Sequence, residues 1–394
     1  MMKKYVIWAV TGLIVAGCSS EKNKASDPLG DSGRTIRTET LLDNLKALGD
    51  STVYLFGQHD ATVYGIGWEA EYDNDSTVHQ RSDVKSVCGD HPAVLSFDLG
   101  HLELGDAKNL DGVPFDRIKK EAIAHFDRGG LVTMSWHPDN PVSGGSSWVA
   151  DSLKDVEAHT VEAVLKGGQQ HELFLEWIDR VADFLNSLET PYGVKVPVLF
   201  RPWHEHTGSW FWWGQEYCTA EQYKALWQLT VKRLKEQRVV NVLYAYSPGT
   251  EADGDEEKYL ERYPGDEVID LLGLDCYCWA PEGDSVQIRQ YATTLDKSLE
   301  MVCRVARKHD KVVALTETGY ECLKSVDWWT RTLAPLLERH ALSYVLVWRN
   351  AHNRPNHFFG PYPGQQSASD FVRFYNDPHT LFLKDVNGLY VGNQ

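Results

Sequence analysis

Short apolar runs recur along the chain, and longer stretches with the periodicity of amphipathic helices separate them. Within each run the apolar residues are continuous rather than alternating, which is typical of strands buried on both faces of a parallel sheet. The runs predict strands at residues 53–59, 93–99, 131–136, 196–202, 241–247, 268–275, 312–317 and 344–348. Apolar residues spaced three and four apart predict helices between them, for example at 115–127, 174–188, 223–234, 291–307 and 328–337.

Strands that alternate with helices in this way predict an α/β fold, a (β/α)8 TIM barrel. The alternative is an open, doubly wound sheet, but no Gly-x-Gly-x-x-Gly motif follows the first predicted strand to support it. No repeat of fixed period and no low-complexity linker interrupts the pattern. We therefore expect a single catalytic domain over residues 35–394, with the last helix and a closing tail within 366–394.

The start of the chain has the pattern of a bacterial signal peptide. Lys3 and Lys4 precede an apolar stretch that is too short to span a bilayer comfortably, and small residues then lead to Cys18. This ending resembles a lipobox, which implies cleavage of residues 1–17 and lipidation of Cys18. Ordinary cleavage that leaves a free cysteine is the alternative. Residues 18–34 are polar and predict a flexible tether. We expect a cell-envelope lipoprotein, in the periplasm or at the outer membrane, with the lipid as its only membrane contact.

Charge and cysteine content narrow the possible partners. The formal net charge is -17, and such a surface repels phosphate backbones, so we expect no nucleic-acid partner. Six cysteines remain besides Cys18, and no Cys-x-x-Cys pair suggests a metal or redox motif. Disulfides are possible in the cell envelope, but the sequence does not reveal their pairing. We expect a monomer without a cofactor or a bound metal.

In a (β/α)8 barrel the chemistry gathers where the strands end. The residues at or just after the predicted strand ends are mainly polar or aromatic. They are Gln58, His59, Asp60, Asp98, Trp136, His137, Asp139, Arg201, Trp203, His204, Glu205, Tyr246, Ser247, Asp275, Tyr277, Glu317, Trp348, Arg349 and Asn350. A carboxylate in such a place is often only a helix N-cap or half of a salt bridge, and Asp98 and Asp275 are open to that interpretation.

Two glutamates carry the candidate chemistry. Glu205 follows the fourth predicted strand and Glu317 ends the seventh, so they should face each other across the barrel mouth. Cleavage of a glycosidic bond needs one proton donor and one anionic partner on either side of the sugar. Aromatic rings stack on the apolar faces of sugars, and the run SWFWWG (209–214) is expected to supply such platforms. Trp203 and Trp210 are expected to form an apolar wall beside Glu205, which would help its carboxyl group to keep a proton.

Metal binding is the chemical alternative. His204 and His206 have the spacing His-x-His, and His137 could reach the same mouth to complete a zinc site. Residues two apart point the same way only if the strand continues past Pro202.

Several segments resemble glycoside hydrolase family 26. RPWHEHTGSWFWWG (201–214) is similar to the acid/base segment of that family, and ALTETGYE (314–321) is similar to its nucleophile segment. SWHPDNP (135–141), LDCYCW (274–279) and VLVWRNAHN (345–353) resemble further segments in the same order. The resemblance runs from about residue 42 to the C-terminus. It implies a barrel with catalytic glutamates at the C-terminal ends of strands four and seven.

The resemblance also implies residue roles. Glu205 would be the acid/base and Glu317 the nucleophile, with hydrogen bonds from Tyr277 and Arg201 keeping Glu317 ionised. The other implied contacts are His204 beside the acid/base, His137 and Trp210 near the cleavage point, Trp348 as the floor of the −1 subsite, and Trp148 further along the groove.

The best-known members of the family act on β-mannans, so the resemblance implies an endo-β-1,4-mannanase. Its substrate would be mannan, galactomannan or glucomannan, cleaved with retention by double displacement. Family members that cut β-1,3-xylan or mixed-linkage β-glucan leave those substrates as alternatives. A lipoprotein that binds glycans without cutting them is a further alternative, although a binder does not need two opposed glutamates. Tolerance of galactose side chains and the endo or mannobiose-releasing mode are not determined by the sequence.

Overall fold

Eight parallel strands form a closed barrel in the computed structural model, which describes residues 27–392. Each strand pairs with the next, and β10 pairs with β1 through Leu55 and Tyr344 to close the ring. The strands are β1 (Tyr54–His59), β4 (Val94–Asp98), β5 (Leu131–Trp136), β6 (Val198–Pro202), β7 (Val242–Tyr246), β8 (Leu271–Cys278), β9 (Val312–Tyr320) and β10 (Tyr344–Val347). The predicted (β/α)8 barrel is confirmed.

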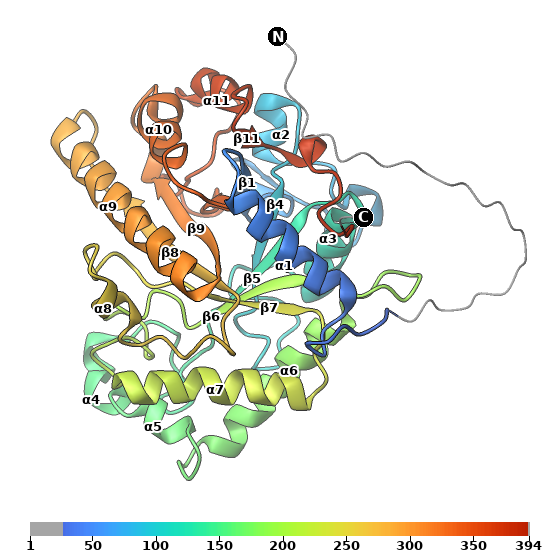
Figure 1. The fold of residues 1–394 in the computed structure, drawn as a ribbon, viewed down its shortest axis with the longest axis vertical. Helices are drawn as coiled ribbons and strands as arrows, with labels where there is room; N and C mark the ends of the chain where they lie inside the picture. Colours follow the sequence, from blue (N-terminus) through green and yellow to red (C-terminus); the bar gives the residue numbers. More distant parts are fainter. Residues whose placement is uncertain (1–26, 393–394) are drawn as a thin grey trace, which may run out of the picture.

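Helices surround the strands on all sides of the barrel (Figure 1). The longer helices are α1 (Ile36–Gly49), α3 (Phe115–Asp127), α6 (His171–Ser187), α7 (Ala220–Glu236), α9 (Ser285–His309) and α11 (Ala368–Tyr375). The shorter ones are α2 (Asp83–Cys88), α4 (Lys154–Glu157), α5 (Thr160–Val164), α8 (Glu256–Leu260) and α10 (Ala334–Leu337).

The helices follow the apolar spacing of the sequence and begin at recognisable caps. In α3, Phe115, Ile118 and Ala122 lie on one buried face. At the start of α7 the Thr219 side chain accepts from the Gln222 backbone while the Gln222 side chain accepts from the Thr219 backbone. This reciprocal pair satisfies two of the free donors of the first turn, and it places the start of α7 directly after the segment that carries Glu205.

Several elements differ from the predicted pattern. β8 and β9 continue past the predicted ends because their pairing extends to Cys278 and Tyr320. The predicted helix 328–337 is a π-helical turn (Trp329–Leu333) followed by α10. Unpredicted elements include α1, the short helices α2, α4, α5 and α8, the hairpin of β2 (Tyr64–Gly65) and β3 (Trp68–Glu69), and β11 (Thr380–Leu381), which pairs with the start of β1. The short ones have too few residues for a visible periodicity.

Helix α1 packs near the beginnings of the strands and leaves the opposite end free for a site. It contacts β7 and β9, and Arg34, just before it, pairs with Asp270 at 2.7 Å immediately before β8. None of the helices within residues 27–392 is both long and apolar enough to cross a membrane. The six cysteines in this range are free thiols. The predicted signal peptide, Cys18 and most of the tether lie outside the described residues.

Candidate active site

A turn with unusual backbone geometry presents Glu205 at the end of β6. Trp203 and Glu205 both have positive φ angles, 55° and 51°, which are uncommon for residues with a side chain. Side chains hold this turn from below: the Tyr223 hydroxyl donates to the Trp203 carbonyl at 2.6 Å, and the Trp213 indole donates to the His204 carbonyl at 2.8 Å. The surrounding packing therefore fixes the direction of the Glu205 side chain.

Most of the aromatic residues in this segment build the turn rather than face the cavity. Trp203, Trp212 and Trp213 are fully buried and pack against one another. The expectation of sugar platforms is therefore wrong for Trp212 and Trp213, and Trp203 is a core residue rather than a wall of Glu205. Only Trp210 and Phe211 of the run line the cavity. A buried indole and an exposed one look identical in the sequence.

Glu317, on β9, is buried and held by two donors. The Tyr277 hydroxyl donates to Glu317 Oε2 at 2.6 Å, and the Arg201 guanidinium donates to Glu317 Oε1. Arg201 also donates to Asp275 at 2.8 Å and to the Ser247 hydroxyl at 3.0 Å. Asp275 is thus half of a salt bridge, as its simpler interpretation suggested. The arrangement compensates the charge on Glu317.

The two glutamates face each other across a short gap. One carboxylate oxygen from each of Glu205, Asp275 and Glu317 lies within 4.8 Å of the others. Glycosidases that retain configuration separate their two carboxyl groups by roughly 5–5.5 Å, whereas inverting enzymes need roughly 6.5–9.5 Å to admit a water molecule. The gap between Glu205 and Glu317 therefore corresponds to the retaining geometry.

The surroundings of Glu205 favour its protonated form. Burial in the cavity raises the pKa of Glu205 well above the usual value, and the negative charges of Glu317 and Asp275 raise it further. Arg201 and the Trp210 indole, which donates to Glu205 Oε2 at 2.8 Å, oppose this shift without reversing it. Glu205 can therefore hold a proton at a pH where an ordinary glutamate would be ionised.

A chain of hydrogen bonds links Asp98, His137 and His204 beside Glu205. Asp98 Oδ2 lies 2.6 Å from His137 Nδ1, and His137 Nε2 lies 2.9 Å from His204 Nε2. Burial alone would lower the pKa of His137, but the Asp98 carboxylate outweighs it and raises that pKa. Burial, Arg201 and His137 lower the pKa of His204, so His204 is neutral and accepts from His137. Asp98 is thus half of a salt bridge with His137, as its simpler interpretation suggested, and the same contact orients the His137 ring.

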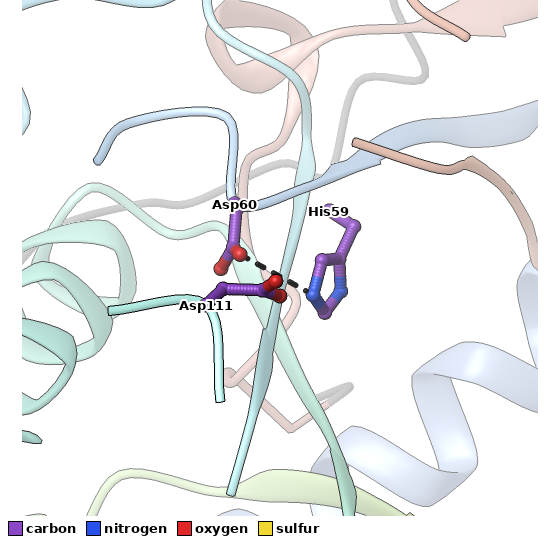
Figure 2. A group of neighbouring side chains, drawn as sticks. All are labelled: His59, Asp60 and Asp111. Atoms are coloured by element: carbon purple, nitrogen blue, oxygen red, sulfur yellow. Dashed lines mark ion pairs between the residues drawn. The ribbon is translucent and has the colours of Figure 1, made fainter. Parts of the chain in front are cut away.

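Trp348 follows β10 and rests on a buried polar group. The His59 ring stacks beneath it, with centroids 4.0 Å apart and planes 20° from parallel. Figure 2 shows the side chains of His59, Asp60 and Asp111 turned toward one another. One nitrogen or oxygen from each lies within 4.8 Å of the others, which is close enough for a cation. Both carboxylates already have partners, however.

Tyr64 and Arg349 are the partners of this group. The Tyr64 hydroxyl donates to Asp60 at 2.5 Å, and the Arg349 guanidinium pairs with Asp111 at 2.6 Å. Arg349 therefore supplies positive charge at the place where a metal ion would have to bind. Asp111 was not among the predicted site residues, because it lies in the loop after β4 and not at a strand end.

A cavity of about 680 Å³ contains most of the predicted site residues. Those that line it are His137, Trp148, His204, Glu205, Trp210, Tyr277, Glu317 and Trp348. Arg201 does not line the cavity and acts from beneath it through Glu317. The lining also includes residues that were not predicted as individual contacts, among them Glu251, Trp279, Gln287, Gln290, His357 and Phe359. Most of these lie in loops or on a helix beyond the strand ends, where residue type alone is not informative.

The histidine pair considered for zinc does not converge. His206 packs against the rings of Tyr223 and Tyr246, at centroid distances of 4.2 Å and 4.9 Å. His204 instead contacts His137. The turn after Pro202 sends the two side chains in different directions, so the His-x-His spacing does not make a common site.

Comparison with known proteins identifies the family. The sequence model of glycosyl hydrolase family 26 matches residues 31–313, most of the chain. The chain belongs to glycosyl hydrolase family 26. The match to this family model ends shortly before Glu317.

Relatives of this family 26 chain include enzymes named for mannan. A mannan endo-1,4-beta-mannosidase of Bifidobacterium adolescentis is 30% identical over 93% of this chain, which spans 37% of that protein. One from Thermothelomyces thermophilus is 26% identical over 80% of this chain and 57% of its own length. The chain thus spans well under two thirds of these curated relatives. The structure of a GH26 beta-mannanase from Bacteroides ovatus has a TM-score of 0.84 and 51% identity, covering 91% of this chain and 98% of that one.

Proposed function

We propose that this family 26 chain is an endo-β-1,4-mannanase that hydrolyses β-mannan with retention of configuration. The observation that carries the proposal is the pair Glu205 and Glu317, whose carboxylate oxygens approach within 4.8 Å while their surroundings differ. Glu317 is held by two donors, and Glu205 has a raised pKa. One carboxylate is thus prepared to attack and the other to donate a proton.

In the first step Glu317 attacks the anomeric carbon while the glycosidic C–O bond breaks. Glu205 transfers its proton to the departing oxygen, so the leaving chain departs neutral and a glycosyl ester of Glu317 remains. Esterification removes the negative charge of Glu317, which is one of the causes of the raised pKa of Glu205. The pKa of Glu205 therefore falls, and Glu205 stays ionised until it accepts a proton from the attacking water. That water attacks the ester, releasing the sugar and restoring Glu317.

The neighbouring residues position the sugar and the two carboxyls. His204, oriented through His137 and Asp98, borders the acid/base, and Tyr277 and Arg201 stabilise Glu317. Trp348 forms the floor beneath the sugar on the nonreducing side of the cleaved bond.

Trp210 and Trp148 extend the groove. Their rings are close to parallel, with centroids 6.4 Å apart. This spacing suits a saccharide that continues along the rim of the cavity.

The choice of mannan is supported by the names of the relatives described above. The decisive experiment incubates the purified chain with linear mannan, galactomannan, glucomannan, lichenan and β-1,3-xylan, and follows reducing sugars and products over time. We expect release from the mannans, with a spread of oligosaccharides early in the reaction. Release from lichenan or β-1,3-xylan alone would contradict the substrate, and binding without release from any glycan would contradict the activity.

We further propose that the protein is a monomeric lipoprotein of the cell envelope, anchored by a lipid on Cys18. The motif that ends at Cys18 supports this location, and the polar residues after it would tether the barrel to the membrane.

A further inference from the structure

Two tryptophans are exposed within residues 27–392, and both line the active-site cavity. Trp148 is 58% exposed and Trp279 is 59% exposed. An aromatic ring that is exposed inside a ligand cavity offers a flat apolar face on which a sugar can stack. Trp148 already has a place in the proposed groove, whereas Trp279 has no part in the mechanism above.

The order of the strands places Trp279 on a defined side of the cleaved bond. Glu205 follows β6 and Glu317 lies on β9, so β7 and β8 are on one side of the line between them. β10, β1, β4 and β5 are on the other side. A glycan that passes between the two carboxyls must cross this line. Trp348 follows β10, so the sugar above it lies on that side and the leaving group lies on the side of β7 and β8.

Trp279 lies on the leaving-group side, and neighbouring aromatic residues contact one part of its ring. It follows β8 and leans on the Tyr277 ring, with centroids 5.4 Å apart and planes at 33°. The edge of Phe359 contacts it at a centroid distance of 6.1 Å. These contacts fix the indole, and its exposed fraction leaves room for a flat ligand.

Polar side chains accompany Trp279 along the same wall. Gln287 and Gln290 project from the first turns of α9, and Glu251 comes from the loop after β7; all three line the cavity. Amides and carboxylates are the groups that bind sugar hydroxyls, while an aromatic ring binds the apolar face of the pyranose. A stacking ring and hydrogen-bonding side chains on the same wall of the cavity are the groups expected of a sugar subsite.

We propose that Trp279 is the stacking platform of a leaving-group subsite, which with Gln287 and Gln290 binds a mannosyl unit on the reducing-end side of the cleaved bond. The inference rests on the proposed mannanase function, because it assigns a subsite of that same cleft. Trp279 contributes to the positioning of long substrates and has no part in the bond-making steps.

The test compares a long substrate with one that has no sugar in the leaving group. For Trp279→Ala, we expect the ratio of kcat/KM for mannohexaose to kcat/KM for 4-nitrophenyl β-mannobioside to fall about tenfold, because only the hexaose loses a stacking contact. Trp279→Phe, which keeps an aromatic face, should recover most of this ratio. The matched control is Tyr192→Ala, which removes an exposed aromatic residue from the turn before β6, away from the cavity.

Cleavage positions in mannohexaose labelled with ¹⁸O at its reducing end give a second readout. Loss of the subsite should move the cleavage point toward products with a shorter leaving group. An unchanged ratio and unchanged cleavage positions, or an equal loss on both substrates, would overturn the inference. If the wild-type chain cleaves neither substrate, the proposed function fails instead, so the two failures are distinguishable.

Discussion

At the scale of single residues, the acid/base is tuned by a few contacts that act in opposite directions. Burial and the charges of Glu317 and Asp275 raise the pKa of Glu205, and the hydrogen bond from the Trp210 indole lowers it. Because the acid/base must be protonated to act, activity falls as pH rises through this pKa. In a plot of activity against pH, the decrease at high pH should therefore occur above the pH range in which an ordinary glutamate titrates.

Trp210→Phe removes the indole donor and keeps an aromatic ring. We expect the basic limb of kcat/KM against pH to move to higher pH, because one contact that lowers the pKa of Glu205 is lost. The measurement is a pH profile with 4-nitrophenyl β-mannobioside. Trp148→Phe is the control, since Trp148 lines the cavity and is not a hydrogen-bond partner of Glu205. A limb that stays in place or moves to lower pH in Trp210→Phe would contradict this account.

The expectation that site residues lie at the strand ends predicted the catalytic residues correctly. It did not predict which side chains surround them. Glu205, Glu317 and Tyr277 were predictable because barrel topology collects such positions at one face. Trp212 and Trp213 were misread because solvent exposure depends on the course of the turn, which the sequence does not display. Trp279 was missed because β8 continues to Cys278, past its predicted end at residue 275.

At the scale of elements, the turn after β6 depends on helix α7. The Tyr223 hydroxyl, on α7, donates to the Trp203 carbonyl and accepts from the Trp227 indole at 2.9 Å. Tyr223→Phe leaves both buried groups without this partner. We expect a loss of about 1–3 kcal/mol in the free energy of unfolding. Turnover of mannan should fall more than that of an activated aryl mannoside, because a displaced Glu205 fails mainly as a proton donor.

Thermal unfolding and the ratio of the two activities check this prediction. Tyr259→Phe is the matched control, since the Tyr259 hydroxyl is buried and donates to the Gly273 carbonyl at 2.8 Å, away from the turn. Its stability should fall without a change in the ratio of activities. An unchanged ratio in Tyr223→Phe would show that the turn holds its geometry without this hydrogen bond.

Helices α2 and α3 enclose three buried histidines. His79 Nε2 lies 2.9 Å from His125 Nδ1, and the His79 and His91 rings are 4.3 Å apart. Burial, together with neighbouring positive charge, lowers the pKa of His91 to about 3 and that of His125, mainly through burial, to about 4. The unfolded chain therefore binds more protons than the folded one below about pH 6.5, and stability falls as pH decreases.

His91→Phe should reduce this acid sensitivity. Both ring nitrogens of His91 are buried without a hydrogen-bond partner, so phenylalanine loses no such bond. We expect the decrease in unfolding free energy between pH 7 and pH 5 to become smaller by roughly 2 kcal/mol, as measured by urea titration. His159→Gln, at an exposed position, should leave the decrease as it is. If the unfolding free energy of His91→Phe decreased between pH 7 and pH 5 as much as that of the wild type, His91 would not be neutral in the folded protein.

At the scale of the whole molecule, the barrel was predictable because its strands are continuous apolar runs. Three kinds of short element were not predictable, because tertiary packing defines them rather than a sequence period of their own. They are the hairpin of β2 and β3, the short helices between β5 and α6, and β11. The extension of β8 and β9 depends on their mutual pairing, which single-chain periodicity does not reveal.

The N-terminal lipid is a prediction for the protein in its cell. Cys18→Ser removes the thiol that a lipid would modify, so we expect the protein to move from the membrane fraction to the soluble fraction. Detergent partitioning of wild-type and variant cells measures this, and the mass of the wild-type N-terminal peptide identifies the lipid. A wild-type protein already in the soluble fraction, with an unmodified Cys18, would contradict the anchor.

The central claim is that Glu317 forms a covalent glycosyl ester that Glu205 helps to form and to hydrolyse. Its most direct measurement is the product formed by Glu205→Ala from 4-nitrophenyl β-mannobioside in the presence of azide, analysed by NMR. The aryl leaving group needs no proton, and the small anion can take the place of the missing carboxylate. The account predicts β-mannobiosyl azide, the product of two inversions. An α-azide, or full activity on mannan without Glu205, would contradict it.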